Sequence, residues 1–119
     1  RQTLVDVPMA FEMLFKNIKN GNPDFQKNIG NLNYSVGKHE ELLKQLVVLN
    51  VPKDLSKNHL GAINSLNNVK FAIKNMALAP TDPVKAMMGK KLYDVEIQKV
   101  YDSLKSMQDI FGKYGIYVF

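Results

Sequence analysis

The two histidines, His39 and His59, are the residues best suited to hold a cofactor, because both fall on apolar stripes of neighbouring predicted helices. Histidines that project into the core of a helical bundle can ligate haem or a metal ion. A hairpin that turns near residue 52 offsets the two rings along the helix axis by roughly 9 Å, which is too far for one ion. We therefore predict no cofactor and no metal, and we interpret His39 and His59 as structural polar anchors.

The other groups that catalyse reactions are absent from the sequence or badly spaced. The chain has no cysteine, no Gly-x-Ser-x-Gly motif and no His-Glu-x-x-His motif. Glu40 and Glu41 are adjacent, and Asp94 and Glu96 are two residues apart, so on a helix the members of each pair point in different directions. Neither pair suits a joint acid and base. We predict no catalytic residues and no enzymatic activity.

The charge balance is basic, with sixteen lysine and arginine residues against eleven acidic ones and a formal net charge of +5. Arg1 is the only arginine, although arginine is the residue that recognises phosphates and base edges in two-pronged fashion. The lysines are spread along the whole chain and alternate with acidic residues. This pattern favours a solvated lysine surface and argues against a nucleic-acid interface, while a binder of anionic polymers stays an alternative.

Apolar residues recur at alternating spacings of three and four, which is typical of amphipathic helices. The stripes predict four helices, at residues 6–20, 23–49, 54–79 and 82–114. Because the connections are short, sequential helices should be antiparallel neighbours. The predicted fold is all-α: one domain over residues 1–119, an up-down-up-down four-helix bundle with a short first helix and a long last helix.

Turn-forming residues separate the stripes. Gly21 suits a left-handed helix end, Pro52 breaks the chain before the third helix, and Asp82 before Pro83 forms a helix cap and first helical residue. We interpret Asp82 and Asn64, which follows His59 on the third helix, as further structural polar anchors.

Two glycines interrupt the second helix. Gly30 and Gly37 lie seven residues apart and so share one helix face. Because glycine disfavours a helix interior, we expect a reason for them. The favoured explanation is close packing of a neighbouring helix; the alternatives are a hinge or the approach of a ligand, and composition drift without a structural role.

Apolar residues outside the stripes are the candidates for binding a partner. A methionine pair stands near the start of the longest helix, and four apolar residues follow its predicted end. Methionine adapts to irregular surfaces, and an apolar tail must pack on its own bundle or on a partner. The predicted interaction residues are Met87, Met88, Ile116, Tyr117, Val118 and Phe119.

Short groups of residues in the second half of the chain carry a resemblance. They are Val51-Pro52, His59-Leu60, Ile63-Asn64-Ser65-Leu66, Asp82-Pro83-Val84-Lys85-Ala86, Tyr93, and Phe111-Gly112-Lys113-Tyr114-Gly115-Ile116. Residues 50–119 resemble uncharacterised helical proteins of candidate-phylum bacteria that have an N-terminal signal or membrane segment. The resemblance implies a membrane-anchored domain outside the cytoplasm, in the periplasm or at the cell surface, and it implies no catalytic residues.

The chain begins at Arg1, so we expect it to be part of a longer precursor, with any membrane contact made by a segment outside this chain. The predicted function is non-catalytic: a structural or protein-interaction domain that binds a protein partner or another copy of itself. The alternative is a bundle that binds a small ligand or cofactor in its core.

Overall fold

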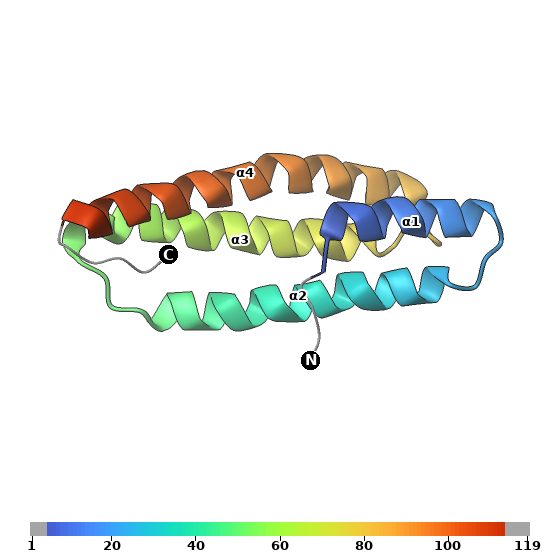
Figure 1. Cartoon of the computed structure of the whole chain (residues 1–119), viewed down its shortest axis with the longest axis horizontal. Helices are drawn as coiled ribbons and strands as arrows, with labels where there is room; N and C mark the ends of the chain where they lie inside the picture. The colour runs from blue at the N-terminus through green and yellow to red at the C-terminus, as the bar shows by residue number, and fades with distance from the viewer. Residues whose placement is uncertain (1–4, 114–119) are drawn as a thin grey trace.

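The computed structural model describes residues 5–113. It contains four α-helices: α1 (Val7–Lys19), α2 (Phe25–Val48), α3 (Ser56–Met76) and α4 (Pro83–Lys113). A single turn of 3₁₀ helix, η1 (Lys53–Leu55), precedes α3. The helices run up and down in sequence, and α1 covers only one end of α2 (Figure 1). The predicted antiparallel four-helix bundle is confirmed, with the first helix shortest and the last longest.

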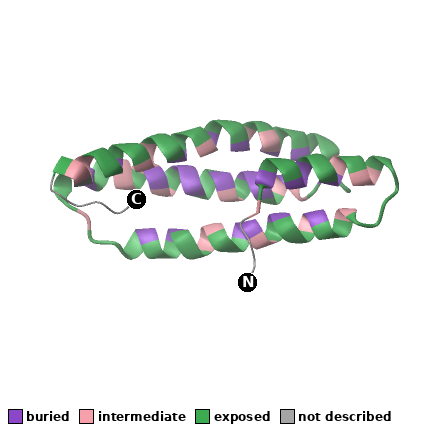
Figure 2. Cartoon of the chain, viewed as in Figure 1, coloured by how far each residue is buried: buried purple, intermediate pink, exposed green. Residues whose placement is uncertain are grey.

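The core follows the predicted stripes. α3 packs against both α2 and α4, and α1 packs against α2. Leu14 of α1, Leu32 of α2 and Ile73 of α3 are completely buried, and Val100 and Met107 of α4 are nearly so. Figure 2 shows that buried residues lie mainly on the inner faces of the helices and exposed residues on the outer faces. Burial of one apolar face per helix is what the spacing of three and four residues requires.

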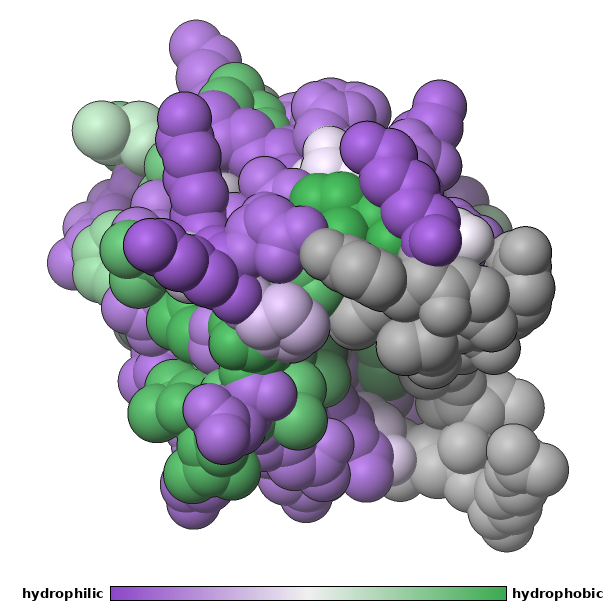
Figure 3. Space-filling model, turned by 90° about the vertical axis from the view of Figure 1, so that its left-hand side faces the viewer, coloured by the Kyte–Doolittle hydropathy of each residue, from purple (hydrophilic) through white to green (hydrophobic). Residues whose placement is uncertain are grey.

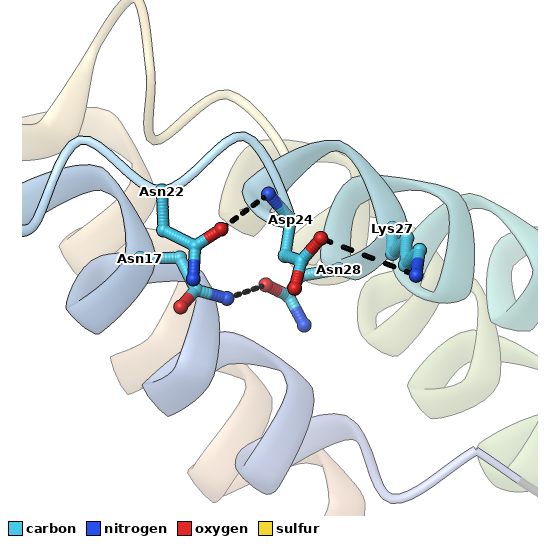
Figure 4. Close-up of polar contacts among 5 residues, drawn as sticks. All are labelled: Asn17, Asn22, Asp24, Lys27 and Asn28. Atoms are coloured by element: carbon cyan, nitrogen blue, oxygen red, sulfur yellow. Dashed lines mark hydrogen bonds and ion pairs between the residues drawn. The ribbon is translucent and has the colours of Figure 1, made fainter.

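The turn between α1 and α2 is fixed by asparagines (Figure 4). Gly21 has a φ of +65°, the left-handed conformation expected at the helix end. The Asn22 side-chain oxygen accepts the Asp24 backbone N–H at 2.9 Å, and the Asn17 amide donates to the Asn28 side-chain oxygen at 2.8 Å. Asn28 is buried, so its bond to Asn17 ties the two helices together where a lone amide would be unfavourable.

Helix ends differ from the expected ones by a few residues. α3 ends at Met76 rather than 79 because Leu78 and Ala79 donate to carbonyls only three residues back, at 3.0 and 3.3 Å. This tight turn leads directly into the cap of α4.

The expectation of close packing at Gly30 and Gly37 is wrong. α2 runs unbroken through both glycines, and a Cβ atom added at either would meet nothing within 4 Å. The close approach lies instead at Gly89 of α4, where an added Cβ would be 2.8 Å from the Ala72 carbonyl oxygen and 2.9 Å from the Asn75 Cβ. α3 and α4 therefore come together through a glycine that the stripe analysis passed over.

A buried carboxylate lies in the same α3–α4 interface. Glu96 is only 4% exposed. Its Oε1 accepts the Asn68 amide at 2.7 Å, and its Oε2 lies 2.8 Å from the Lys99 ammonium. These two partners, the lysine first, lower the pKa of Glu96 below its ordinary value. Because Lys99 and Asn68 compensate the negative charge of Glu96, the carboxylate can be buried in an otherwise apolar interface.

Candidate functional site

Both histidines donate to backbone carbonyls. His39 Nδ1 lies 2.7 Å from the Ser35 carbonyl oxygen, one turn earlier in α2. His59 Nε2 lies 2.6 Å from the Leu46 carbonyl oxygen, in the last turn of α2. A carbonyl only accepts hydrogen bonds, so each of these ring nitrogens carries a proton. His59 thus links the start of α3 to the end of α2, and His39 has a local contact within α2.

The other two predicted anchors differ from each other. Asp82 caps α4: its Oδ1 accepts the Lys85 N–H at 3.0 Å, and its carbonyl accepts the Ala86 N–H at 3.1 Å. Asn64 is exposed on α3, and among the described residues its side chain makes no hydrogen bond. Its contacts are therefore not those of an anchor.

Of the predicted interaction residues, the structure describes only the methionine pair. Met87 and Met88 are 49% and 66% exposed on the first turns of α4. Met88 shares one helix face with the exposed Val84 and Val95, which lie four residues before it and seven after it. The predicted tail residues Ile116, Tyr117, Val118 and Phe119 lie outside the described residues.

A groove lies between α2 and α3, and most of the surface that lines it is apolar. It has a volume of about 570 Å³. Apolar side chains come from both helices, with polar and charged ones among them. We define the docking groove by its lining residues: Glu40, Leu43, Lys44, Val47, Val48, Ile63, Asn64, Asn67 and Lys70.

Exposed apolar side chains extend the docking groove to the end of the molecule. Val47, Val48 and Leu49 are 62%, 80% and 53% exposed. Figure 3 views the molecule from this end, and hydrophobic surface appears there between hydrophilic side chains. These three residues form an exposed apolar patch at the end of α2, and two of them, Val47 and Val48, also line the docking groove.

The predicted interaction residues do not include this patch, although the sequence contains a signal for it. Leu46, Val47, Val48 and Leu49 are four consecutive apolar residues. Successive helical residues turn by about 100°, so four in a row cannot all face one core. Leu46 is buried and the next three are exposed.

Lysines dominate the charge around the docking groove. The Lys70 and Lys74 ammonium groups lie 3.9 and 4.0 Å from the same oxygen of Glu40. Lys44 is exposed and has no ion-pair partner among the described residues. Three lysines thus stand against one glutamate, and the surface is positive.

A second cleft, of about 530 Å³, lies where α1 begins, beside the middle of α4. It is lined partly by Asp6, Tyr93, Asp94 and Tyr101. Burial is the main reason that the pKa of Tyr93 rises to about 12, with Tyr101, Asp6 and Asp94 adding to it. Asp6 accepts the Met9 N–H at 3.1 Å, and Asp94 binds Lys90 at 2.8 Å. Both carboxylates thus already have structural partners.

The described residues contain no group of three or more side chains placed to hold a metal ion. Among the described helices, none combines the length and the hydropathy needed to cross a lipid bilayer. Comparison of the chain with known protein families, curated proteins and solved structures finds no match. The case for function therefore rests on the geometry of the docking groove.

Proposed function

We propose that this domain is a non-catalytic protein-interaction module that binds a protein partner in the docking groove. The observation that carries the proposal is the exposure of Val47, Val48 and Leu49 beside that groove. Covering a valine or leucine side chain removes apolar area from water and contributes about 1.5–3 kcal/mol at most. A partner that covers these exposed side chains would therefore gain binding free energy from the apolar area that it removes from water.

The end of α2 is well suited to present these side chains because it is fixed from beneath. Leu43 and Leu46 are buried, and His59 donates to the Leu46 carbonyl. A surface that is already ordered loses less conformational entropy on binding than a mobile one. The fixed last turn supports the view that the patch is a binding surface.

The test is a matched pair of substitutions. Val48→Asp places a charge in the patch, and Val84→Asp places one at a comparably exposed site on α4, which does not line the docking groove. We expect Val48→Asp to abolish capture of the partner in cross-linking from cells of the source, and Val84→Asp to leave capture intact. Circular dichroism should show both variants folded. Equal capture by both variants would refute the proposal.

The extracytoplasmic, membrane-anchored setting is a second part of the proposal, and it is supported only by the resemblance of residues 50–119. Protease accessibility in intact cells, compared with cells that have been permeabilised, measures it directly. The outer membrane, where the cells have one, is first removed while the inner membrane stays intact. If the protease then fails to cleave the domain, this placement is contradicted, and the docking proposal is unaffected.

A further inference from the structure

We infer that the occupant of the docking groove is an acidic amphipathic helix of another protein, an inference that rests on the proposed function. The floor of the groove consists of two antiparallel helices, and an amphipathic helix is a common occupant of such a groove. The α2 residues that line it span 40–48. At 1.5 Å per residue this is about 13 Å, the length of two to three helical turns.

The positive charge of the docking groove favours acidic residues on either side of the apolar stripe of that helix. Lys44 and Lys70 line the groove, and Lys74 lies beside it, within 4.0 Å of Glu40. Glu40 offsets only one of the three positive charges. Acidic residues beside the apolar stripe of a partner would face these lysines, and complementary charges favour both encounter and register. Asn64 and Asn67 are exposed in the groove and offer amide donors to the same carboxylates.

A second copy of this chain fits less well, for an electrostatic reason. One exposed apolar stripe that another copy could offer is the α4 face with Val84, Met88 and Val95. Lys91 stands four residues before Val95 on the same face and so lies beside that stripe, whereas the charge of Lys99 is already paired with Glu96. Docking it in the groove would bring Lys91 against the lysines of the groove in a chain whose formal net charge is +5. The observations therefore favour an acidic partner over self-association.

The experiment uses three fluorescent synthetic peptides of about four turns that share one leucine stripe and differ only in their flanking residues, which are glutamate, glutamine or lysine. Anisotropy titration should give the glutamate peptide an affinity about tenfold above that of the lysine peptide at low salt. The difference should shrink as salt is added, because exposed charges are screened.

Two charge reversals locate the effect. Lys44→Glu, in the docking groove, should abolish or invert the preference for the glutamate peptide. Lys91→Glu, on α4, makes the same change of charge outside the groove and should leave the preference as it was. Val48→Asp should weaken all three peptides.

The outcomes separate this inference from the proposed function. Equal affinity for the three peptides, all weakened by Val48→Asp, would retain the docking function and overturn the acidic helix. If none of the peptides binds, the helix inference is overturned. The docking function would still be supported if the unaltered chain captures the partner in cells and the Val48→Asp variant does not. Binding to vesicles of phosphatidylglycerol and phosphatidylcholine in equal parts, in place of the peptides, would assign the surface to a membrane and overturn the inference. Salt-resistant dimerisation lost with Val48→Asp would assign it to a second copy, with the same consequence.

Discussion

Glu96 shows how a single polar residue can serve an apolar interface. Its carboxylate is almost wholly buried between α3 and α4, yet Asn68 and Lys99 satisfy both of its oxygens. Loss of one partner from such a group exposes the full cost of desolvation, which exceeds the net gain from the intact pair. The residue therefore specifies which turn of α4 faces Asn68.

We expect Glu96→Gln to lower the free energy of unfolding by about 1–2 kcal/mol at pH 7. The lowered pKa means that the native state favours the ionised carboxylate. That contribution is present above the ordinary glutamate pKa, and it is lost as the pH falls through the lower native pKa. Urea unfolding of both proteins at pH 7 and pH 3 should show the difference shrinking in acid. A difference of the same size at both values would contradict this account.

Tyr93 should respond at the opposite end of the pH scale. Its pKa is raised to about 12, so between the ordinary tyrosine value and 12 the native state binds the proton more strongly. Stability should fall over this window relative to Tyr93→Phe, by less than the roughly 3 kcal/mol that the full shift would give, because Tyr93 lines an open cleft in which solvent screens the charge. Unfolding of both proteins between pH 9 and 12 measures it, and lysine deprotonation affects both alike. Parallel curves for the two proteins would show that Tyr93 makes no such contribution.

At the scale of the helix, the contrast between glycines is instructive. Gly30 and Gly37 drew attention because they interrupt a helix, but they lie on an open face. Gly89 sits between good helix formers and gives no such signal, yet its Cα lies so close to α3 that an added Cβ would collide with the Ala72 carbonyl oxygen. Which face of a helix meets a neighbour depends on the partner's position, and sequence spacing within one helix does not contain that information.

Alanine substitutions should separate the two kinds of glycine. Gly89→Ala would force the added methyl group against the Ala72 carbonyl and should cost about 1–3 kcal/mol. Gly37→Ala meets no neighbour and should gain about 0.5–1 kcal/mol from its better helix propensity. Thermal unfolding of the two variants would decide the matter. Stabilisation by Gly89→Ala would mean that the interface relaxes without cost.

A second contrast concerns the two histidine bonds. His59→Phe removes the donor that joins α3 to the last turn of α2 and should cost about 1 kcal/mol. Hydrogen exchange of the amides at residues 46–49 should quicken as that turn loosens. His39→Phe removes a bond within one turn and serves as the control. Equal protection of residues 46–49 in both variants would exclude a clamping role for His59.

Across the whole molecule, the unequal helices separate two ends. α1 has 13 residues and α4 has 31, and α1 covers the end of α2 that is remote from Val47, Val48 and Leu49 (Figure 1). The proposed binding function belongs to the opposite end of α2, at Val47, Val48 and Leu49, which α1 leaves uncovered. The interaction residues predicted from the sequence are the methionine pair and the C-terminal tail, so the docking groove became visible only in the tertiary structure.

The chain's own order was sufficient to predict its four helices, the breaks between them, the turn at Gly21 and the cap at Asp82. It did not predict the starts of α2 and α3, whose N-cap residues are Asp24 and Leu55. Stripes, Gly21 and Asp82 act over a few residues, and local sterics and hydrogen bonding decide their conformation. The docking groove, the approach at Gly89 and the burial of Glu96 arise between residues distant in sequence. They depend on how three helices are rotated against one another, because rotation alone determines whether Val48 meets a neighbour or water.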